Sequence, residues 1–209
     1  MKNLIKYMGI APVLLSITTE IDVYAAEANP SAEITSGVEV QISPGTLTLD
    51  KVANFNFGTS SVEAIANGDV ILPVINGNVT NTSATDNIEL NTQISDYRGA
   101  NSDGWSLRLD LGELKNSSNT EIILAQSELN IIPEVPEDFT GNAPVGLSII
   151  PGNGEVELLS ANSGKGLRTN EFTFDGTTTN LTIKQQDIIS GRYQADLTWS
   201  LYDAYSPQQ

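Results

Sequence analysis

The side chains able to do chemistry in this chain of 209 residues are carboxylates, hydroxyls and a few cationic groups. Histidine and cysteine are both absent, which excludes a Ser-His-Asp triad, a cysteine nucleophile, a zinc finger and a disulfide. Ser163, Gly164 and Lys165 place a serine just before a lysine in a glycine-rich stretch. The Ser-x-x-Lys spacing of a nucleophile pair and the strand-loop-helix context of a phosphate loop are both missing. We therefore predict a hairpin turn there.

The acidic residues are numerous but show no spacing typical of a metal or catalytic site. Residues 134–138 and 101–103 carry potential oxygen ligands, yet neither has the pattern of a calcium loop. A glycosidase needs two carboxylates at a fixed separation, which a sequence with 26 acidic residues does not identify. We expect no metal, no cofactor and no enzymatic activity. Cleavage of glycans is the least favoured function, behind binding to a ligand and a structural role in a complex.

The charge balance argues against polyanionic partners. Against 26 Asp and Glu the chain has 10 Lys and Arg, a formal net charge of -16. Nucleic acids and anionic lipids are recognised first through Lys and Arg that neutralise phosphate. Nucleic acid and anionic lipid are therefore both excluded as main partners.

The N-terminus has the features of an export signal. Early lysines precede a mainly apolar run over residues 7–17, and small residues follow near Ala25. A basic start, a short apolar centre and small residues at a cleavage point characterise a secretory signal peptide, and the run is too short to span a bilayer. We predict a signal peptide over residues 1–25, a flexible leader over residues 26–36 and no transmembrane segment. The protein is expected to be secreted.

Short alternating segments separated by turn residues dominate the rest of the chain. Two stretches, residues 122–129 and 183–190, have the pattern for a helical turn or two. Clusters of Gly, Asn, Asp and Pro separate the period-two segments. The pattern predicts an all-β fold, a single antiparallel β-sandwich or barrel-like domain over residues 37–209, with residues 193–201 as a central strand. The strands expected from period two are residues 38–42, 55–57, 105–111, 145–149, 172–174, 181–183 and 193–201.

Two related segments contain the chain's two tryptophans. Each tryptophan has a leucine two residues later. The longer contexts resemble the WxL domain of Gram-positive surface proteins, in which an Asp-x-Arg-Gly segment leads to the first Trp-x-Leu and a Tyr-x-x-x-Leu-Thr segment leads to the second. The positions that carry the resemblance are Asp96, Arg98, Gly99, Gly104, Trp105, Leu107, Tyr193, Leu197, Trp199 and Leu201.

The resemblance extends over residues 36–205 and implies a small WxL protein of the cell surface. It implies non-covalent attachment to the cell wall with peptidoglycan as the ligand. It also implies partnership with other WxL proteins and with a membrane-anchored WxL-interacting protein. The alternative to peptidoglycan binding is that the protein is a structural subunit of a surface complex and that its direct ligand is a partner protein.

Alternatives remain open for the motif residues. Trp and Leu two residues apart share one face of a strand, so we expect both tryptophans in the core. The alternative is an indole ring that stacks on sugar or on a partner. Asp96 and Arg98 either contact a ligand or form an internal ion pair that orders the loop before Trp105, and the ion pair is favoured.

Overall fold

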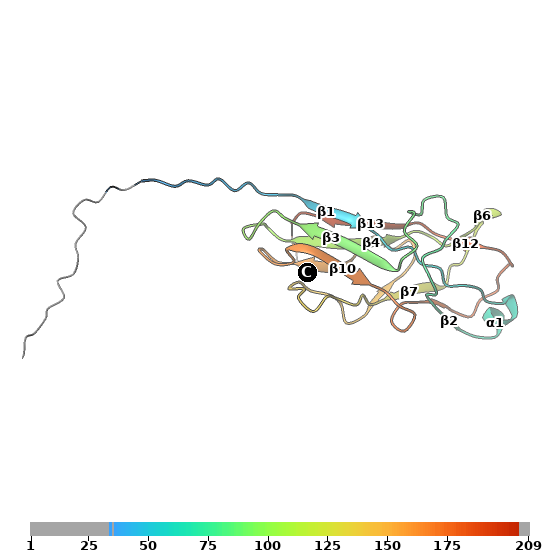
Figure 1. The fold of residues 1–209 in the computed structure, drawn as a ribbon. Coiled ribbons are helices and arrows are strands. Elements are labelled where there is room, and N and C mark those ends of the chain that lie inside the picture. Colours follow the sequence, from blue (N-terminus) through green and yellow to red (C-terminus); the bar gives the residue numbers. More distant parts are fainter. Residues whose placement is uncertain (1–33, 35, 205–209) are drawn as a thin grey trace, which may run out of the picture. The chain divides into compact units, whose positions relative to one another are not determined.

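The computed structural model describes residues 34 and 36–204 (Figure 1). The predicted signal peptide, residues 1–25, and the leader up to residue 33 lie outside the described part. The chain divides into two units, Met1–Gln41 and Ile42–Gln209. Every helix and strand of the described part belongs to the second unit.

The strand expected over residues 38–42 is not formed. These residues have no regular secondary structure, and no strand of the described part pairs with them. The alternation of apolar residues is nevertheless present, and it is exposed: Val38 is 98%, Val40 81% and Ile42 87% accessible to solvent. The sequence pattern was strand-like, but a strand also needs a neighbour to pair with.

The second unit is all-β and sandwich-like, which confirms the predicted fold class. All of its strand pairs are antiparallel. Among the described residues, no helix has the length and hydropathy needed to cross a membrane. The elements are, in chain order, β1 (Leu47–Lys51), α1 (Val62–Asn67), β2 (Val70–Pro73), β3 (Asn91–Asp96), β4 (Trp105–Leu111), β5 (Lys115–Asn116), β6 (Asn119–Ile123), β7 (Ser127–Ile131), β8 (Leu147–Ile149), β9 (Val156–Ala161), β10 (Arg168–Thr173), β11 (Asn180–Ile183), β12 (Tyr193–Gln194) and β13 (Leu197–Tyr202).

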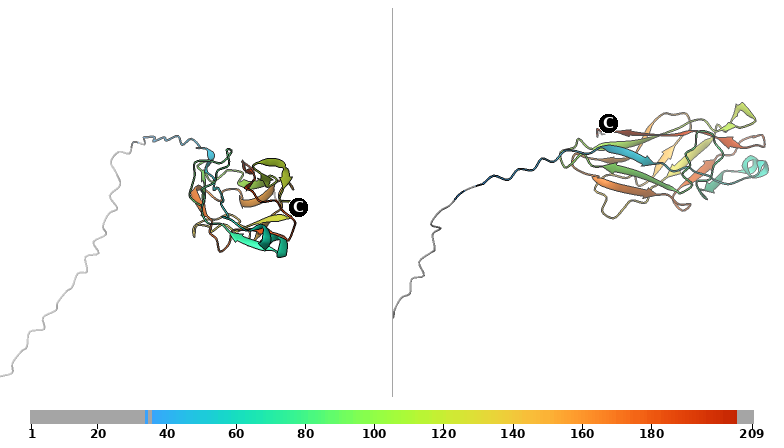
Figure 2. Two further views of the ribbon diagram at one scale, coloured as in Figure 1. Left: turned by 90° about the vertical axis from the view of Figure 1, so that its right-hand side faces the viewer. Right: turned by 45° about the horizontal axis from the view of Figure 1, so that its top comes forward.

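The strands of residues 36–204 form four small sheets, ordered β1-β3-β10, β2-β11-β7-β8, β12-β5-β6 and β13-β4-β9. Figure 1 shows β3 between β1 and β10, and Figure 2 shows the strands of the second unit from two further sides. Residues 193–201, expected as one central strand, are divided between β12 and β13, and each of these lies at the edge of its sheet. The expected central position is therefore wrong.

One main core connects three of the sheets. Trp105, Leu107 and Leu109 of β4 are all 0% exposed, and they belong to the same cluster as Ile94 of β3 and Ile131 of β7. Each fully buried large apolar side chain contributes about 1.5–3 kcal/mol, so this cluster is the main source of stability. The alternation seen in the sequence of β4 thus marks a strand with one face in the core.

Neither stretch expected to hold helical turns is helical. Residues 122–129 belong to β6, β7 and the turn between them, and residues 183–190 are the end of β11 followed by irregular chain. The helix of the described part is α1, which the alternating sequence pattern did not predict. Its N-cap is Ser61, whose hydroxyl accepts a hydrogen bond from the Ala64 N–H at 3.0 Å. Residues 55–57, expected as a strand, form only a single bridge through Asn56.

Candidate binding surfaces

The two Trp-Leu segments, far apart in the sequence, lie on neighbouring strands of one sheet. In the register of β4 and β13, Leu107 is opposite Leu201 and Leu109 is opposite Trp199. Side chains of a strand alternate between its faces, so these residues and Trp105 all face the core. The leucines therefore pair at the centre of the arrangement, with one tryptophan on either side of them.

The two tryptophans differ in their surroundings. Trp105 is 0% exposed, and its indole N–H donates to the Gly166 carbonyl at 3.3 Å. Trp199 is only partly buried: it packs against Phe55 and Phe174, with ring centroids 6.4 and 6.1 Å away, and it also lines a cavity. The core interpretation is confirmed for Trp105, whereas Trp199 belongs both to the edge of the core and to a concave surface.

Asp96 and Arg98 form the internal ion pair that the sequence favoured. Arg98 donates from Nη2 to Asp96 Oδ2 at 2.8 Å and from Nε to Oδ1 at 3.0 Å, and Asp96 is 1% exposed. These hydrogen bonds are the main cause that raises the pKa of Arg98. The same guanidinium donates to the carbonyls of Gly104 at 2.8 Å and Asp203 at 3.1 Å. It thereby ties the loop before Trp105 to the end of β13.

Two glycines allow this loop to turn. Gly99 has a φ of 97° and Gly104 a φ of 84°, in the left-handed region that favours glycine. A Cβ on Gly104 would also overlap the carbonyl oxygen of Ala161. The backbone before the first Trp-Leu segment, at Trp105 and Leu107, is therefore positioned by the Asp96–Arg98 ion pair and by the two glycines.

The outward side chains of β4 and β13 form a mixed aromatic and charged surface, here called the Tyr202 face. Tyr202 is 42% exposed, and the Arg108 guanidinium lies 5.0 Å from the centre of its ring. Its hydroxyl donates to the Glu155 carboxylate, 2.9 and 3.1 Å from the two oxygens. The Tyr202 face comprises Arg108, Asp110, Glu155, Glu157, Thr198, Ser200 and Tyr202.

The hydrogen bond between Tyr202 and Glu155 favours the neutral, protonated phenol of Tyr202. The hydrogen bond to Glu155 is the main cause that raises the pKa of Tyr202 above its ordinary value. Arg108 Nε and Glu157 Oε2 are buried without a hydrogen-bond partner among the described residues.

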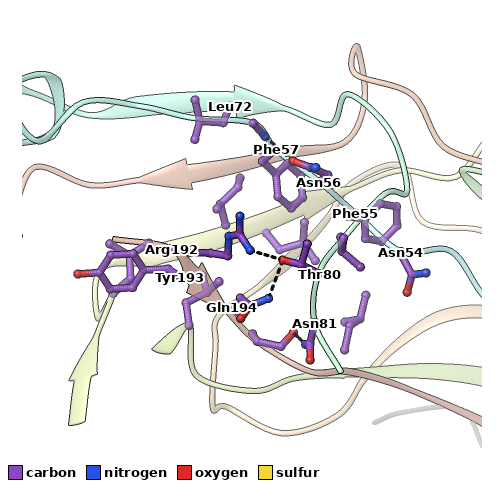
Figure 3. Close-up of a pocket in the computed structure, with 18 of the residues that line it drawn as sticks. Asn54, Phe55, Asn56, Phe57, Leu72, Thr80, Asn81, Arg192, Tyr193 and Gln194 are labelled. Atoms are coloured by element: carbon purple, nitrogen blue, oxygen red, sulfur yellow. Dashed lines mark hydrogen bonds between the residues drawn. The ribbon is translucent and has the colours of Figure 1, made fainter. Parts of the chain in front are cut away.

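A second candidate is a cavity of about 1070 Å³ beside β12 and β13 (Figure 3). Residues 52–58 line one side and residues 188–199 another. Residues 78–85, here called the cover loop, also line it, except for Thr82. Its interior is largely apolar, with Phe55, Phe57, Leu72, Leu111, Leu129 and Trp199 among the lining residues.

Side-chain hydrogen bonds attach the cover loop to both sides of the cavity. Thr80 Oγ1 accepts from Arg192 Nη1 at 2.6 Å and from Gln194 Nε2 at 3.4 Å, as Figure 3 shows. On the other side, Asn54 and Asn56 donate to backbone carbonyls of the loop at 2.9 and 2.7 Å. The cavity thus has an apolar interior and a rim of amides, hydroxyls and one guanidinium.

The structure distributes the motif residues over several places. Tyr193, Leu197 and Trp199 line the cavity, while Trp105, Leu107 and Leu201 pack in or against the core. Sequence reasoning did not single out Tyr202, although the alternation over residues 193–201 extends to it and predicts its outward direction.

Other sequence expectations concern catalytic and metal sites. Residues 163–164 form a turn between β9 and β10, but these two strands belong to different sheets and do not pair, so the predicted hairpin is wrong and only the turn is present. Among the described residues, no group of three or more Asp and Glu side chains is placed to hold a metal ion.

Comparison with known proteins adds the family. A family model described as "WxL domain surface cell wall-binding" matches residues 26–204. Searches of curated proteins and of solved structures found no match. The match covers all of the described residues, including both Trp-Leu segments and their paired strands. The chain therefore belongs to the WxL domain family of cell-wall-binding surface proteins.

Proposed function

We propose that this protein is secreted and attaches non-covalently to the Gram-positive cell wall by binding peptidoglycan through the Tyr202 face. The description of the family supports the wall as the target. The observation that carries the choice of surface is Tyr202 itself, an exposed ring held in place by Arg108 and Glu155. The proposed activity is binding without turnover.

The groups on this surface match the chemistry of peptidoglycan, which combines acetylated amino sugars with short peptides bearing amines and carboxylates. A ring that is already held in place offers a flat apolar surface for a sugar and loses little conformational entropy on binding. Arg108 suits a carboxylate of the ligand, and Asp110 and Glu157 suit an amine. The outward hydroxyls of Thr198 and Ser200 add further hydrogen-bonding groups.

Replacing Tyr202 with alanine is expected to weaken retention on purified peptidoglycan about tenfold, because about 1.4 kcal/mol is a typical loss for an aromatic contact residue. The measurement is co-sedimentation with insoluble peptidoglycan stripped of protein and teichoic acid, with melting temperature as the check on folding. Tyr97→Ala is the matched control, since Tyr97 is 57% exposed but lies at the end of β3. Equal losses for the two variants, or full retention of Tyr202→Ala, would contradict the choice of surface.

Charge is expected to make binding to intact walls dependent on pH and salt. The protein carries a formal charge of -16 and the wall carries anionic polymers, so the two repel each other at pH 7. With reference pKa values near 3.9 and 4.3, part of the carboxylates protonate by about pH 4.5, although Asp69 and Asp175 stay ionised longer because hydrogen bonds lower their pKa. Retention should therefore rise from pH 7 to about 4.5, and salt at pH 7 should raise it by screening. Walls stripped of anionic polymer should show smaller effects, and salt that weakens binding would contradict this account.

A second candidate function is that of a structural subunit whose direct ligand is a protein. The observation that favours it is the group of large apolar side chains in the cavity lining, against which a peptide can bury its own apolar side chains. Other WxL proteins and a membrane-anchored WxL-interacting protein are the partners that the family implies. Retention on stripped peptidoglycan only after a partner is added would support this function, and release of soluble sugar fragments would instead indicate an enzyme.

A further inference from the structure

The 38–42 segment has the pattern of a strand but has no sheet in the described part of the chain. Val38, Val40 and Ile42 fall on one side when the chain is extended, and each is more than four-fifths exposed. Glu39 and Gln41 fall on the other side. Secreted proteins rarely leave a row of this kind uncovered, because unpaired apolar strands associate.

The cavity offers the 38–42 segment two things it lacks, apolar side chains to pack against and a sheet edge to pair with. Its lining includes large apolar side chains, among them Phe57, Leu111 and Trp199. Beside it, β12 pairs only with β5 and β13 only with β4, so both strands lie at sheet edges. An extended peptide adds to a sheet edge through main-chain hydrogen bonds, and its alternate side chains enter pockets. The cavity and the edge together form an acceptor for one more strand.

The charges at the rim of the cavity favour one orientation of the 38–42 segment in it, with Glu39 toward Arg192. Arg192 and Gln194 at the rim share a single hydroxyl acceptor, Thr80 Oγ1 (Figure 3). A carboxylate is a stronger acceptor for a guanidinium than a hydroxyl. With Val38 and Val40 inside the cavity, Glu39 points outward to the rim, where Arg192 is exposed.

The spacing along the chain favours docking of the 38–42 segment in the cavity of another molecule, not in the cavity of its own chain. Gly45 is held by a hydrogen bond from its N–H to the Tyr97 carbonyl at 2.8 Å. Ile42 stands three residues before Gly45, about 10 Å of extended chain, whereas Val52 at the cavity is seven residues after it, about 23 Å along β1. Val38, seven residues before Gly45, could span about 23 Å, but Ile42 of the same chain falls short of Val52 while this bond is intact. The three apolar side chains of the segment therefore cannot all enter the cavity of their own chain.

We infer that the 38–42 segment of one copy docks as an added strand in the cavity of a second copy. Val38, Val40 and Ile42 enter the cavity, the backbone runs beside β12, and Glu39 meets Arg192. The contact joins two different surfaces, so it repeats head to tail and makes association depend on concentration. The inference does not rest on the Tyr202 face, and peptidoglycan binding can fail without affecting it.

The first test compares two variants that each add one negative charge to the segment. Val40→Glu places the charge on the apolar side, and Gln41→Glu places it one residue away on the opposite side. Analytical ultracentrifugation of the secreted protein from about 1 to about 100 µM is expected to show a mass that grows with concentration. Val40→Glu should weaken this association at least about tenfold, and Gln41→Glu less than about twofold. A constant monomer mass for the unaltered protein, or equal effects of the two variants, would overturn the inference.

The second test identifies the acceptor. A synthetic peptide of residues 36–44 contains no aromatic residue, so titration into the Val40→Glu protein reports on the protein's own tryptophans. A saturable change in emission is expected because Trp199 lines the cavity, and the change should be absent in a Trp199→Phe protein. A response unchanged by Trp199→Phe, or no response to the peptide, would overturn docking in the cavity.

A charge exchange tests the orientation. Glu39→Lys and Arg192→Glu should each weaken association, and the two changes combined in one chain should restore it, because every contact then again joins opposite charges. Additive losses in the double variant would overturn the pairing of Glu39 with Arg192.

Discussion

Replacing Trp105 with alanine is expected to lower the free energy of unfolding by about 3–5 kcal/mol, a large share of the stability of a domain of this size. The side chain is 0% exposed, so its removal leaves a void among close-packed neighbours. It also removes one of two hydrogen bonds to the Gly166 carbonyl, which still accepts from Asn170 Nδ2 at 3.0 Å. Trp199→Ala should cost about half as much, because Trp199 is partly buried and already borders a cavity. Urea unfolding followed by far-ultraviolet circular dichroism measures both.

Trp105→Phe is the control that keeps most of the apolar volume and removes the indole N–H. It should cost less than the alanine variant and gives a folded protein should Trp105→Ala fail to accumulate. A larger loss for Trp199→Ala than for Trp105→Ala would contradict the different positions assigned to the two tryptophans.

Removing the guanidinium of Arg98 is the second change expected to have a large effect. Arg98→Ala leaves the Asp96 carboxylate, whose side chain is 0% exposed, without its charge partner, and breaking a buried pair in this way costs about 3–5 kcal/mol. It also removes the hydrogen bonds to the Gly104 and Asp203 carbonyls that connect the first motif to the end of β13. The free energy of unfolding measured in urea is the readout.

Lys184→Ala is the matched control for this experiment. Lys184 pairs with Asp69 at 3.1 Å, but these side chains are 50% and 51% exposed, so water replaces the lost partner and the cost should stay below about 1 kcal/mol. Arg98→Lys should be intermediate, because a lysine keeps the charge and loses the two-pronged contact with Asp96. Similar losses for Arg98→Ala and Lys184→Ala would show that the Asp96 pair is not shielded from water.

Several features were readable from the sequence because they depend on residues close together in the chain. Alternation along residues 105–111 predicted a strand with one face in the core, and Trp105, Leu107 and Leu109 are buried there. Asp96 and Arg98 stand two residues apart, so a favoured ion pair between them needed no knowledge of the rest of the fold. The spacing around both tryptophans was likewise enough to suggest the family that the comparison then showed.

The sequence by itself thus determined the all-β class, the inward faces of the motif strands and the Asp96–Arg98 ion pair before Trp105. These features depend on side-chain alternation and on neighbouring charges, which are local properties. The tertiary structure decided which strands became neighbours. It paired Leu107 with Leu201 and placed β12 and β13 at sheet edges. It left the 38–42 segment, with its equally good alternation, without a paired strand among the described residues. It also created the cavity and the Tyr202 face from residues scattered along the chain. The physical reason is that a β-strand takes its hydrogen bonds from another part of the chain, so pairing depends on which segments fold together.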